Sequence, residues 1–268
     1  MIFGNKLNIS LLECDVIWNN KQANLKQLEN NLNSIPKGTD IVVLPELFST
    51  GFYIEKPNEM KELAERNTEE TILTLSELAK KYNIAISGSF IARTADKIYN
   101  RAFFIESSGY ETYYDKRHTY NIGGEDIIFT AGNSKPLIIR YRGWNILIVV
   151  CYDLRFPVWL RNNNCKYDII IVVANWPKTQ DYEWQHLLIA RAIENQCYVC
   201  GCNRIGYSPS GIEYIGNSMF VDFRGKIIKT NDTKGSIIST SLSSEKLNSF
   251  RTNCPVWKDF DKFELKMF

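Results

Sequence analysis

The chain lacks the features that mark several common classes of protein. Its formal net charge is only +2, so it has no excess of basic residues for nucleic acid or an anionic membrane, and we expect a small molecule as its partner. It contains no run of about 18 apolar residues and no leader-like start, so we expect a cytoplasmic protein. No linker rich in glycine, proline or serine divides its 268 residues, which predicts a single domain, 1–268.

Histidine is also scarce, with only His118 and His186 in the chain. Histidine is the usual base beside a cysteine nucleophile, so a reactive cysteine here needs one of these two or another base. The seven cysteines are an odd number without a framework-like spacing, which predicts reduced thiols. Cys197, Cys200 and Cys202 cluster in "CYVCGC", but no fourth cysteine or histidine follows at a zinc-like interval. We therefore expect neither a metal nor an organic cofactor.

Apolar runs and helical spacings alternate along the chain. Strands are predicted at residues 6–13, 40–46, 83–90, 168–175, 198–203, 213–222, 226–230 and 235–241, with hairpins at 99–116 and 136–151. Helices are predicted at residues 25–35, at 68–82 with Asn67 as its cap, from Cys151 to about 163, and at 180–196. This is too many strands for one doubly wound sheet of this length, so we expect two sheets packed face to face with helices outside.

Three buried runs end in a polar or reactive residue. "IVVLPE" ends at Glu46, "ILIVVC" at Cys151 and "IIVVAN" at Asn175. Ligands bind beyond the carboxyl ends of strands in open α/β sheets, so we expect these side chains to meet in one crevice. Cys151 also precedes a predicted helix start with Asp153 as candidate N-cap, and such a position lowers the pKa of a thiol. From this local pattern alone, a buried structural cysteine is an equal alternative.

Three separated motifs follow one another along the chain, and they are "VVLPELFSTGF" with Glu46, "YDKRHTY" with Lys116 and "VVCYDLRFPVW" with Cys151. Together, in this order, they resemble the motifs of the nitrilase (carbon–nitrogen hydrolase) superfamily. The resemblance implies a Glu-Lys-Cys catalytic set and a four-layer αββα sandwich of two mixed sheets. It also implies a second glutamate, which falls on Glu125 in "NIGGEDIIFTAG", with Asp126 adjacent.

The resemblance covers nearly the whole chain and favours one branch. The segment from "ANWPKTQ" to "GNSMFVD" and the tail "FRTNCPVWKDFDKF" are similar to bacterial ω-amidases, which hydrolyse the terminal amide of 2-oxo acids such as 2-oxoglutaramate and 2-oxosuccinamate. Cys254 departs from the aromatic residue expected before Pro255. The resemblance further implies a homodimer, with the tail at about 243–268 contributing to the interface.

The same chemistry follows from the residue types. A thiol of ordinary pKa, about 8.5, is mostly protonated at neutral pH, and Glu46 is available as its base. Lys116 and the backbone N–H of Tyr152 would stabilise the oxyanion that forms when sulfur attacks an amide carbonyl. Glu46 would then protonate the leaving ammonia and activate the water that releases the acid. Glu125 would position the substrate or Lys116.

Substrate-binding residues are predicted from their chemistry. Arg155, four residues after Cys151, carries the guanidinium suited to a carboxylate, and a structural ion pair is its alternative. Three aromatic residues are candidates for the pocket wall, with a place in the core as their alternative: Phe48, Tyr53 and Trp176.

Other functions stay open from the sequence. An N-carbamoyl-amine hydrolase or another aliphatic amidase would use the same catalytic set, and a nitrilase fits the tail less well. A thiol–imidazole hydrolase would use His118 or His186 as the base instead. A non-catalytic binding module would require a broken catalytic set, whereas the set here is complete.

Overall fold

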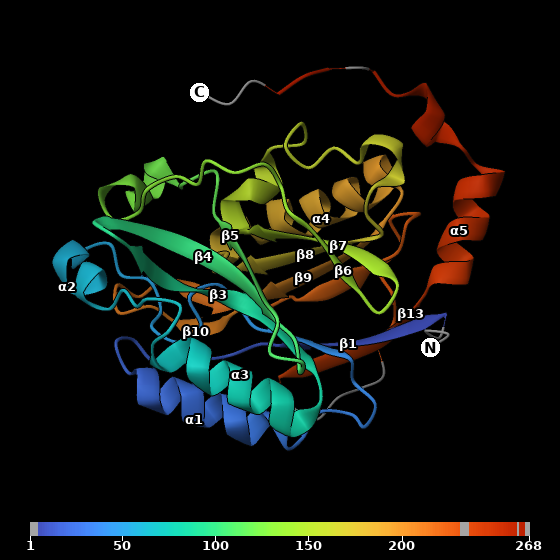
Figure 1. Cartoon of the computed structure of the whole chain (residues 1–268). Helices are drawn as coiled ribbons and strands as arrows, with labels where there is room; N and C mark the ends of the chain where they lie inside the picture. Colours follow the sequence, from blue (N-terminus) through green and yellow to red (C-terminus); the bar gives the residue numbers. More distant parts are fainter. Residues whose placement is uncertain (1–4, 231–235, 262, 266–268) are drawn as a thin grey trace.

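The computed structural model describes residues 5–230, 236–261 and 263–265 (Figure 1). One mixed sheet has six strands, which in spatial order are β13 (Ile237–Ser243), β1 (Lys6–Leu12), β2 (Ile41–Val43), β3 (Ala85–Thr94), β4 (Lys97–Ile105) and β5 (Glu111–Asp115). Strands β1, β2 and β3 are parallel to one another, and the others pair in antiparallel fashion.

A second mixed sheet has five strands. In spatial order they are β12 (Met219–Val221), β9 (Tyr198–Asn203), β8 (Ile169–Ala174), β7 (Trp144–Val150) and β6 (Ile138–Tyr141). Its central strands β7, β8 and β9 are parallel. A separate two-stranded ribbon joins β10 (Ile205–Tyr207) to β11 (Glu213–Ile215).

Helices cover the outer face of each sheet (Figure 1). The α-helices are α1 (Lys21–Leu32), α2 (Pro57–Glu62), α3 (Glu70–Tyr82), α4 (Asp181–Asn195) and α5 (Ser244–Asn253). The short 3-10 turns are η1 (Asn121–Gly123), η2 (Glu125–Ile127), η3 (Cys151–Arg155), η4 (Asn163–Cys165), η5 (Lys178–Gln180) and η6 (Val256–Asp259). Helices α1 and α3 pack on the six-stranded sheet, and α4 packs on the five-stranded sheet.

The hydrophobic core follows the two-residue period of the strands. Leu7, Ile9 and Leu11 of β1 belong to the cluster between the two sheets, whereas Leu12 and Val42 belong to the cluster beneath α1 and α3. All residues of β8 are buried, as expected for a parallel strand covered on both faces. The two sheets and the outer helices together confirm the predicted αββα sandwich.

Local corrections concern helix starts and weak strands. The N-cap of α3 is Glu69, not Asn67, because the amide oxygen of Asn67 accepts a hydrogen bond from Arg101 at 2.9 Å. The predicted helix after Cys151 is only the turn η3, and Pro157, which has no N–H, follows its end.

Two predicted strands are also revised. The predicted strand 213–222 is broken into β11 and β12, with the left-handed residues Gly216 and Asn217 between them. The predicted strand 226–230 is reduced to a single bridge at Ile227. Residue 235 of the predicted last strand lies outside the described residues.

The C-terminal segment leaves β13 through α5 and η6 and crosses the outside of the molecule (Figure 1). Gln196 anchors it, because its side chain donates to the carbonyl of Cys254 at 2.8 Å and accepts from the N–H of Trp257 at 3.2 Å. Residues 262 and 266–268 of the predicted tail lie outside the described residues. In the part of the chain that is described, no helix is both long and apolar enough to cross a membrane.

Candidate active site

Lys116 lies immediately after β5, almost fully buried, with its ammonium between two carboxylates. Its side chain is 1% exposed, and Nζ lies 2.9 Å from Oε1 of Glu46 and 2.8 Å from Oε1 of Glu125. An ammonium carries three N–H donors, and these two glutamates are its only hydrogen-bond partners within the described residues. One donor of Lys116 is therefore available to another group.

Glu46 accepts hydrogen bonds from residues of both sheets. Its Oε1 also accepts a hydrogen bond from the amide of Asn100 at 2.7 Å, and its Oε2 accepts the backbone N–H of Asn175 at 2.8 Å. Glu46 follows β2 and Asn175 follows β8, so the structure brings these two residues together, through the backbone of Asn175 and not through its side chain as predicted. Asn100 was not predicted from the sequence, and the only signal for it is an amide inside the apolar run of β4.

Glu125 begins η2 and turns toward Lys116. Glu125 is 5% exposed, and its Oε2 accepts the backbone N–H of Tyr120 at 2.8 Å while Oε1 faces the ammonium of Lys116. Asp126, the adjacent carboxylate in the sequence, is exposed. The structure thus brings Glu125, and not Asp126, to the buried lysine.

Cys151 starts η3 directly after β7, in a left-handed backbone conformation with φ of 45°. This conformation is unfavourable for a residue with a side chain, and such strain is concentrated at functional sites. Strands β7 and β8 pair in parallel, with Val150 opposite Val173. The residues that follow these strands, Cys151 and Asn175, therefore lie at the same edge of the sheet.

The pKa of the Cys151 thiol is raised well above its ordinary value, first by burial and then by the charge of Glu46, although Lys116 opposes the shift. The predicted lowering by a helix N-terminus is wrong, because η3 is a single short turn and burial beside carboxylates outweighs it. Asp153 is not the N-cap either, since Val150 holds that position and Asp153 accepts its N–H at 3.2 Å. The thiol needs a base, and Glu46 is the carboxylate whose charge contributes most to the raised pKa.

Two other groups of the cluster have shifted proton affinities. Burial works to lower the pKa of Lys116, but the charges of Glu125 and Glu46 raise it well above its usual value. Burial raises the pKa of Glu125, Lys116 lowers it, and Glu46 raises it further. Lys116 is therefore a cation at neutral pH, and its single positive charge faces the carboxylates of both Glu46 and Glu125.

Comparisons with known proteins show the family of this chain. A model of the carbon–nitrogen hydrolase family matches residues 8–252. This chain belongs to the carbon–nitrogen hydrolase family. It is 40% identical to the omega-amidase YafV of Escherichia coli strain K12 over 260 residues, which are 97% of this chain and 98% of that protein.

Two further relatives of this carbon–nitrogen hydrolase extend the comparison. The chain is 30% identical to the 2-oxoglutaramate amidase of Bacillus subtilis strain 168, across 96% of this chain and 98% of the relative. The crystal structure of XC1258 from Xanthomonas campestris, a CN-hydrolase superfamily protein with an arsenic adduct in its active site, superposes with a TM-score of 0.91. Its sequence is 34% identical, and the match covers 97% of this chain and 99% of that one.

The structure of this hydrolase brings two of the predicted substrate-binding residues together. The guanidinium carbon of Arg155 lies 4.9 Å from the ring centre of Trp176, and Nη2 donates to the side chain of Gln180 at 2.7 Å. Trp176 is itself fixed, because its backbone N–H donates to Asn203 at 2.8 Å and its indole donates to the carbonyl of Gln180 at 2.8 Å. No carboxylate pairs with Arg155 among the described residues.

The other two predicted pocket residues lie apart from this pair. Phe48 is buried in the cluster beneath α1 and α3, with its ring 6.0 Å from that of Phe103. Tyr53 is partly exposed, packs edge-on against Trp18 at 5.4 Å, and donates to Glu55 at 2.9 Å. Their role as pocket walls stays a prediction.

The histidines are engaged in contacts of their own. Nδ1 of His118 lies 2.8 Å from Asp153, and its ring stacks on Phe156 with centres 3.7 Å apart. His186 lies on the exposed side of α4, where its Nδ1 is 2.7 Å from the carbonyl of Tyr182. The residues after Lys116 and Cys151, including His118, Tyr152 and Phe156, line a groove of about 420 Å³.

Tyr214 in β11, which the sequence did not indicate, is affected by the charges of the cluster. It is 7% exposed, and the guanidinium carbon of Arg204 lies 4.7 Å from its ring centre. Burial raises the pKa of Tyr214 to about 12, Arg204 opposes the shift, and the charges of Glu46 and Cys151 add to it. Tyr214 is therefore protonated near the reacting groups.

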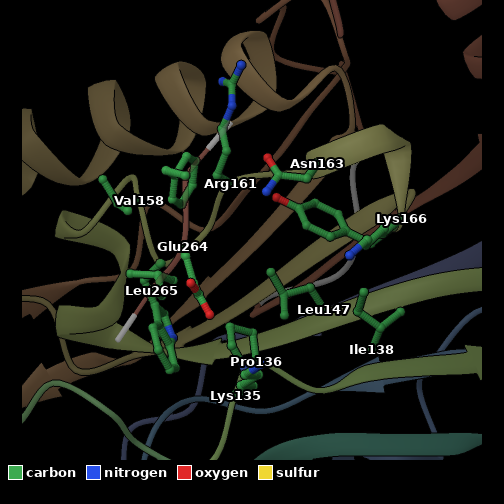
Figure 2. Close-up of a pocket in the computed structure, with 13 residues that line it drawn as sticks. Lys135, Pro136, Ile138, Leu147, Val158, Arg161, Asn163, Lys166, Glu264 and Leu265 are labelled. Atoms are coloured by element: carbon green, nitrogen blue, oxygen red, sulfur yellow. The ribbon is translucent and has the colours of Figure 1, made fainter. Parts of the chain in front are cut away.

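A second pocket, of about 310 Å³, lies away from these groups (Figure 2). Arg161, Lys135 and Lys166 supply its positive charge, and Phe263, Glu264 and Leu265 of the C-terminal segment line its other side. None of the charged residues around Cys151 lines this pocket. Within the described residues, no cluster of three or more histidine, cysteine or acidic side chains could hold a metal ion.

Proposed function

We propose that the protein is an ω-amidase that hydrolyses the terminal amide of small 2-oxo acid amides, with 2-oxoglutaramate and 2-oxosuccinamate as substrates. The observation that carries the proposal is the buried ammonium of Lys116, which binds Glu46 and Glu125 and keeps one donor available, and whose charge acts on the thiol of Cys151. The relatives named for ω-amidase and 2-oxoglutaramate amidase activity support the choice of substrate.

Acylation begins at the protonated thiol. Glu46 takes the proton of Cys151 as sulfur attacks the amide carbonyl, which avoids a free thiolate in a site that disfavours it. The third donor of Lys116 and the backbone N–H of Tyr152 stabilise the oxyanion. Glu46 then gives its proton to the leaving nitrogen, and ammonia departs from a thioester on Cys151.

Deacylation repeats the steps with water as the nucleophile. Glu46 removes a proton from water, and the oxyanion forms again beside Lys116. Collapse of the intermediate releases the acid, while Glu46 returns its proton to the departing sulfur and restores the thiol of Cys151. Glu125 holds the ammonium as a second carboxylate partner beside Glu46, as its 2.8 Å contact with Nζ supports. Its role is therefore to position Lys116 rather than to transfer protons.

Arg155 is proposed to bind the α-carboxylate of the substrate. A guanidinium suits a planar carboxylate, and stacking on Trp176 together with the bond to Gln180 would hold it in one orientation before the substrate arrives. Trp176 forms one wall of the proposed pocket. Phe48 and Tyr53 remain predicted as more distant walls.

We also propose a cytoplasmic homodimer. All seven cysteines are free, which fits a reducing compartment. Exposed apolar side chains in the C-terminal segment, Val256, Phe263 and Leu265, offer a surface for a second subunit. Sedimentation at micromolar concentration checks this, and a monomer at every concentration would contradict the dimer.

A substrate panel tests the proposed activity. Release of ammonia is measured with 2-oxoglutaramate, 2-oxosuccinamate, glutamine, N-carbamoyl-β-alanine and a simple nitrile, with the Cys151→Ala variant as the control. We expect turnover of the two oxo-acid amides and none in the variant. Turnover of the N-carbamoyl compound alone would instead assign the alternative amidohydrolase, and turnover that survives Cys151→Ala would exclude thioester chemistry.

A further inference from the structure

Asp153 is fully buried two residues after Cys151, and its carboxylate accepts four hydrogen bonds. Oδ1 accepts the backbone N–H of His118 at 3.0 Å and the ring Nδ1 of the same residue at 2.8 Å. Oδ2 accepts the hydroxyl of Tyr114 at 3.0 Å and the backbone N–H of Val150 at 3.2 Å. Because an ionised carboxylate has only acceptors, Nδ1 of His118 carries the proton in this contact.

The four donors come from the segments that carry the reacting groups. Tyr114 and His118 lie two residues before and two residues after Lys116, and Val150 directly precedes Cys151. Lys116 follows β5 of the six-stranded sheet, whereas Cys151 follows β7 of the five-stranded sheet. No strand ladder joins these two segments, so side-chain contacts must set the distance between the lysine and the cysteine.

We propose that Asp153 is a positioning residue that fixes Lys116 relative to Cys151, and this inference rests on the catalytic roles proposed above. A reacting group displaced by about 1 Å can cost roughly 10²-fold in rate. The carboxylate of Asp153 binds the backbone of the lysine segment at His118 and the backbone of the cysteine segment at Val150. It can therefore set the distance between Lys116 and Cys151. Its hydrogen-bond partners are Tyr114, His118 and Val150, none of which is one of the proposed reacting groups.

The hydroxyl of Tyr114 extends the network on the lysine side. It accepts the backbone N–H of Arg117 at 3.2 Å and the indole N–H of Trp159 at 3.1 Å, while it donates to Asp153. Three donor or acceptor contacts therefore meet at one buried oxygen. They hold the chain on both sides of Lys116, because Tyr114 precedes it and Arg117 follows it.

Asp168, which directly precedes β8, provides a matched control because it also binds the backbone of β7. Its carboxylate accepts the backbone N–H of Asn145 near the start of β7 at 3.0 Å, and it pairs with Arg251 at 2.7 Å. Asp168 therefore resembles Asp153 in anchoring β7, but at the end of the strand away from Cys151. A purely structural role predicts similar effects for Asp153→Asn and Asp168→Asn.

The first experiment compares these two variants. In Asp153→Asn the amide nitrogen cannot accept, so two of the four donors lose their partner whichever way the amide is oriented. We expect kcat for 2-oxoglutaramate to fall by about 10²-fold with KM nearly unchanged, while Asp168→Asn changes neither greatly. Equal kcat in the two variants would overturn the inference, and melting temperatures show whether both are folded.

A second pair of variants separates positioning from catalysis by the imidazole. His118→Asn can keep a donor near the position of Nδ1, whereas His118→Ala removes it. The positioning role predicts that His118→Asn retains at least about tenfold more turnover than His118→Ala, since one hydrogen bond to a charged group is at stake. Equal loss in both variants would overturn this role for His118.

Alkylation of Cys151 gives a readout that does not depend on the substrate. The rate of iodoacetamide addition at this residue is followed by mass spectrometry of its peptide. We expect a slower reaction in Asp153→Asn than in Asp168→Asn, because the thiol is displaced from its base. Equal rates would contradict the positioning role, whereas full amidase turnover in Cys151→Ala would instead contradict the proposed function.

Discussion

Two buried cations in this fold are held by carboxylates in different ways. Arg251 of α5 donates to Asp168 at 2.7 Å, and its other two nitrogens donate to the backbone carbonyls of Gln196 and Tyr167 at 2.9 and 2.7 Å. Lys116 has two carboxylate partners and one donor without a partner among the described residues. Arg251 therefore fastens α5 to the five-stranded sheet, whereas Lys116 can still bind another oxygen.

The balance of charge differs between the two sites as well. One aspartate pairs with Arg251, but two glutamates face Lys116. Matched charges stabilise a structural pair, whereas the excess negative charge around Lys116 contributes to the raised pKa values of Glu125 and Cys151. Burial of a cation alone therefore does not indicate catalysis. Excess carboxylate and an available donor distinguish the Lys116 site from the Arg251 site.

Among the variants that test this comparison, Glu46→Gln is expected to reduce turnover the most. The glutamine cannot take a proton from a thiol whose pKa is raised, so we expect turnover to fall by about 10²–10⁴-fold. The acyl-enzyme should also be missing from intact-mass spectra after mixing with substrate. Accumulation of thioester in this variant would show that another group is the base.

Lys116→Met ranks next, because it removes charge and donor together. Loss of one oxyanion donor costs about 10²–10³-fold in kcat, and we expect a decrease of this size with 2-oxoglutaramate. The pKa of Glu125, which Lys116 lowers, should rise, so the variant should keep its fold by protonation of a carboxylate. Near-normal turnover in a folded variant would remove Lys116 from the mechanism.

Arg251→Met tests the structural member of the comparison. It leaves Asp168 partly buried without its partner, and breaking such a pair typically costs about 3 kcal/mol of unfolding free energy. Urea denaturation should show this loss, while kcat of the folded variant should stay close to that of the parent protein. A large fall in kcat under conditions where the variant is still folded would mean that the two cation sites are coupled.

The sequence predicted which residues come together at Lys116 better than it predicted their environment. Motif order pointed to Glu46, Lys116, Cys151 and Glu125, and the structure places the two glutamates on the lysine. The expected fall in the pKa of Cys151 was wrong, because burial beside carboxylates depends on the packing of two sheets. Sequence spacing carries no information on such packing.

Residues that reach the site from distant strands were also missed. Asn100 in β4 and Tyr214 in β11 lie in ordinary strand patterns, and only tertiary structure brings them near Glu46. In the fold, long apolar strands were predicted well because burial on both faces leaves a clear run. The strand predicted at 226–230 failed because it has only one bridge, at Ile227.

The smallest expected effect concerns Glu125 and pH. Its pKa is raised in the folded protein by burial and by Glu46, so the folded state binds more protons than the unfolded chain between the unfolded value, about 4.3, and the raised folded value. The free energy of unfolding must therefore fall as pH rises through this window, and the loss is complete above the folded pKa. Glu125→Gln, which cannot ionise, should lack this slope. Urea denaturation from pH 4.5 upward measures the slope of the unfolding free energy with pH. Asp126→Asn is the control, because Asp126 is the adjacent carboxylate and is exposed. The same slope in Glu125→Gln as in the parent protein would show that the unbalanced charge around Lys116 resides on another residue.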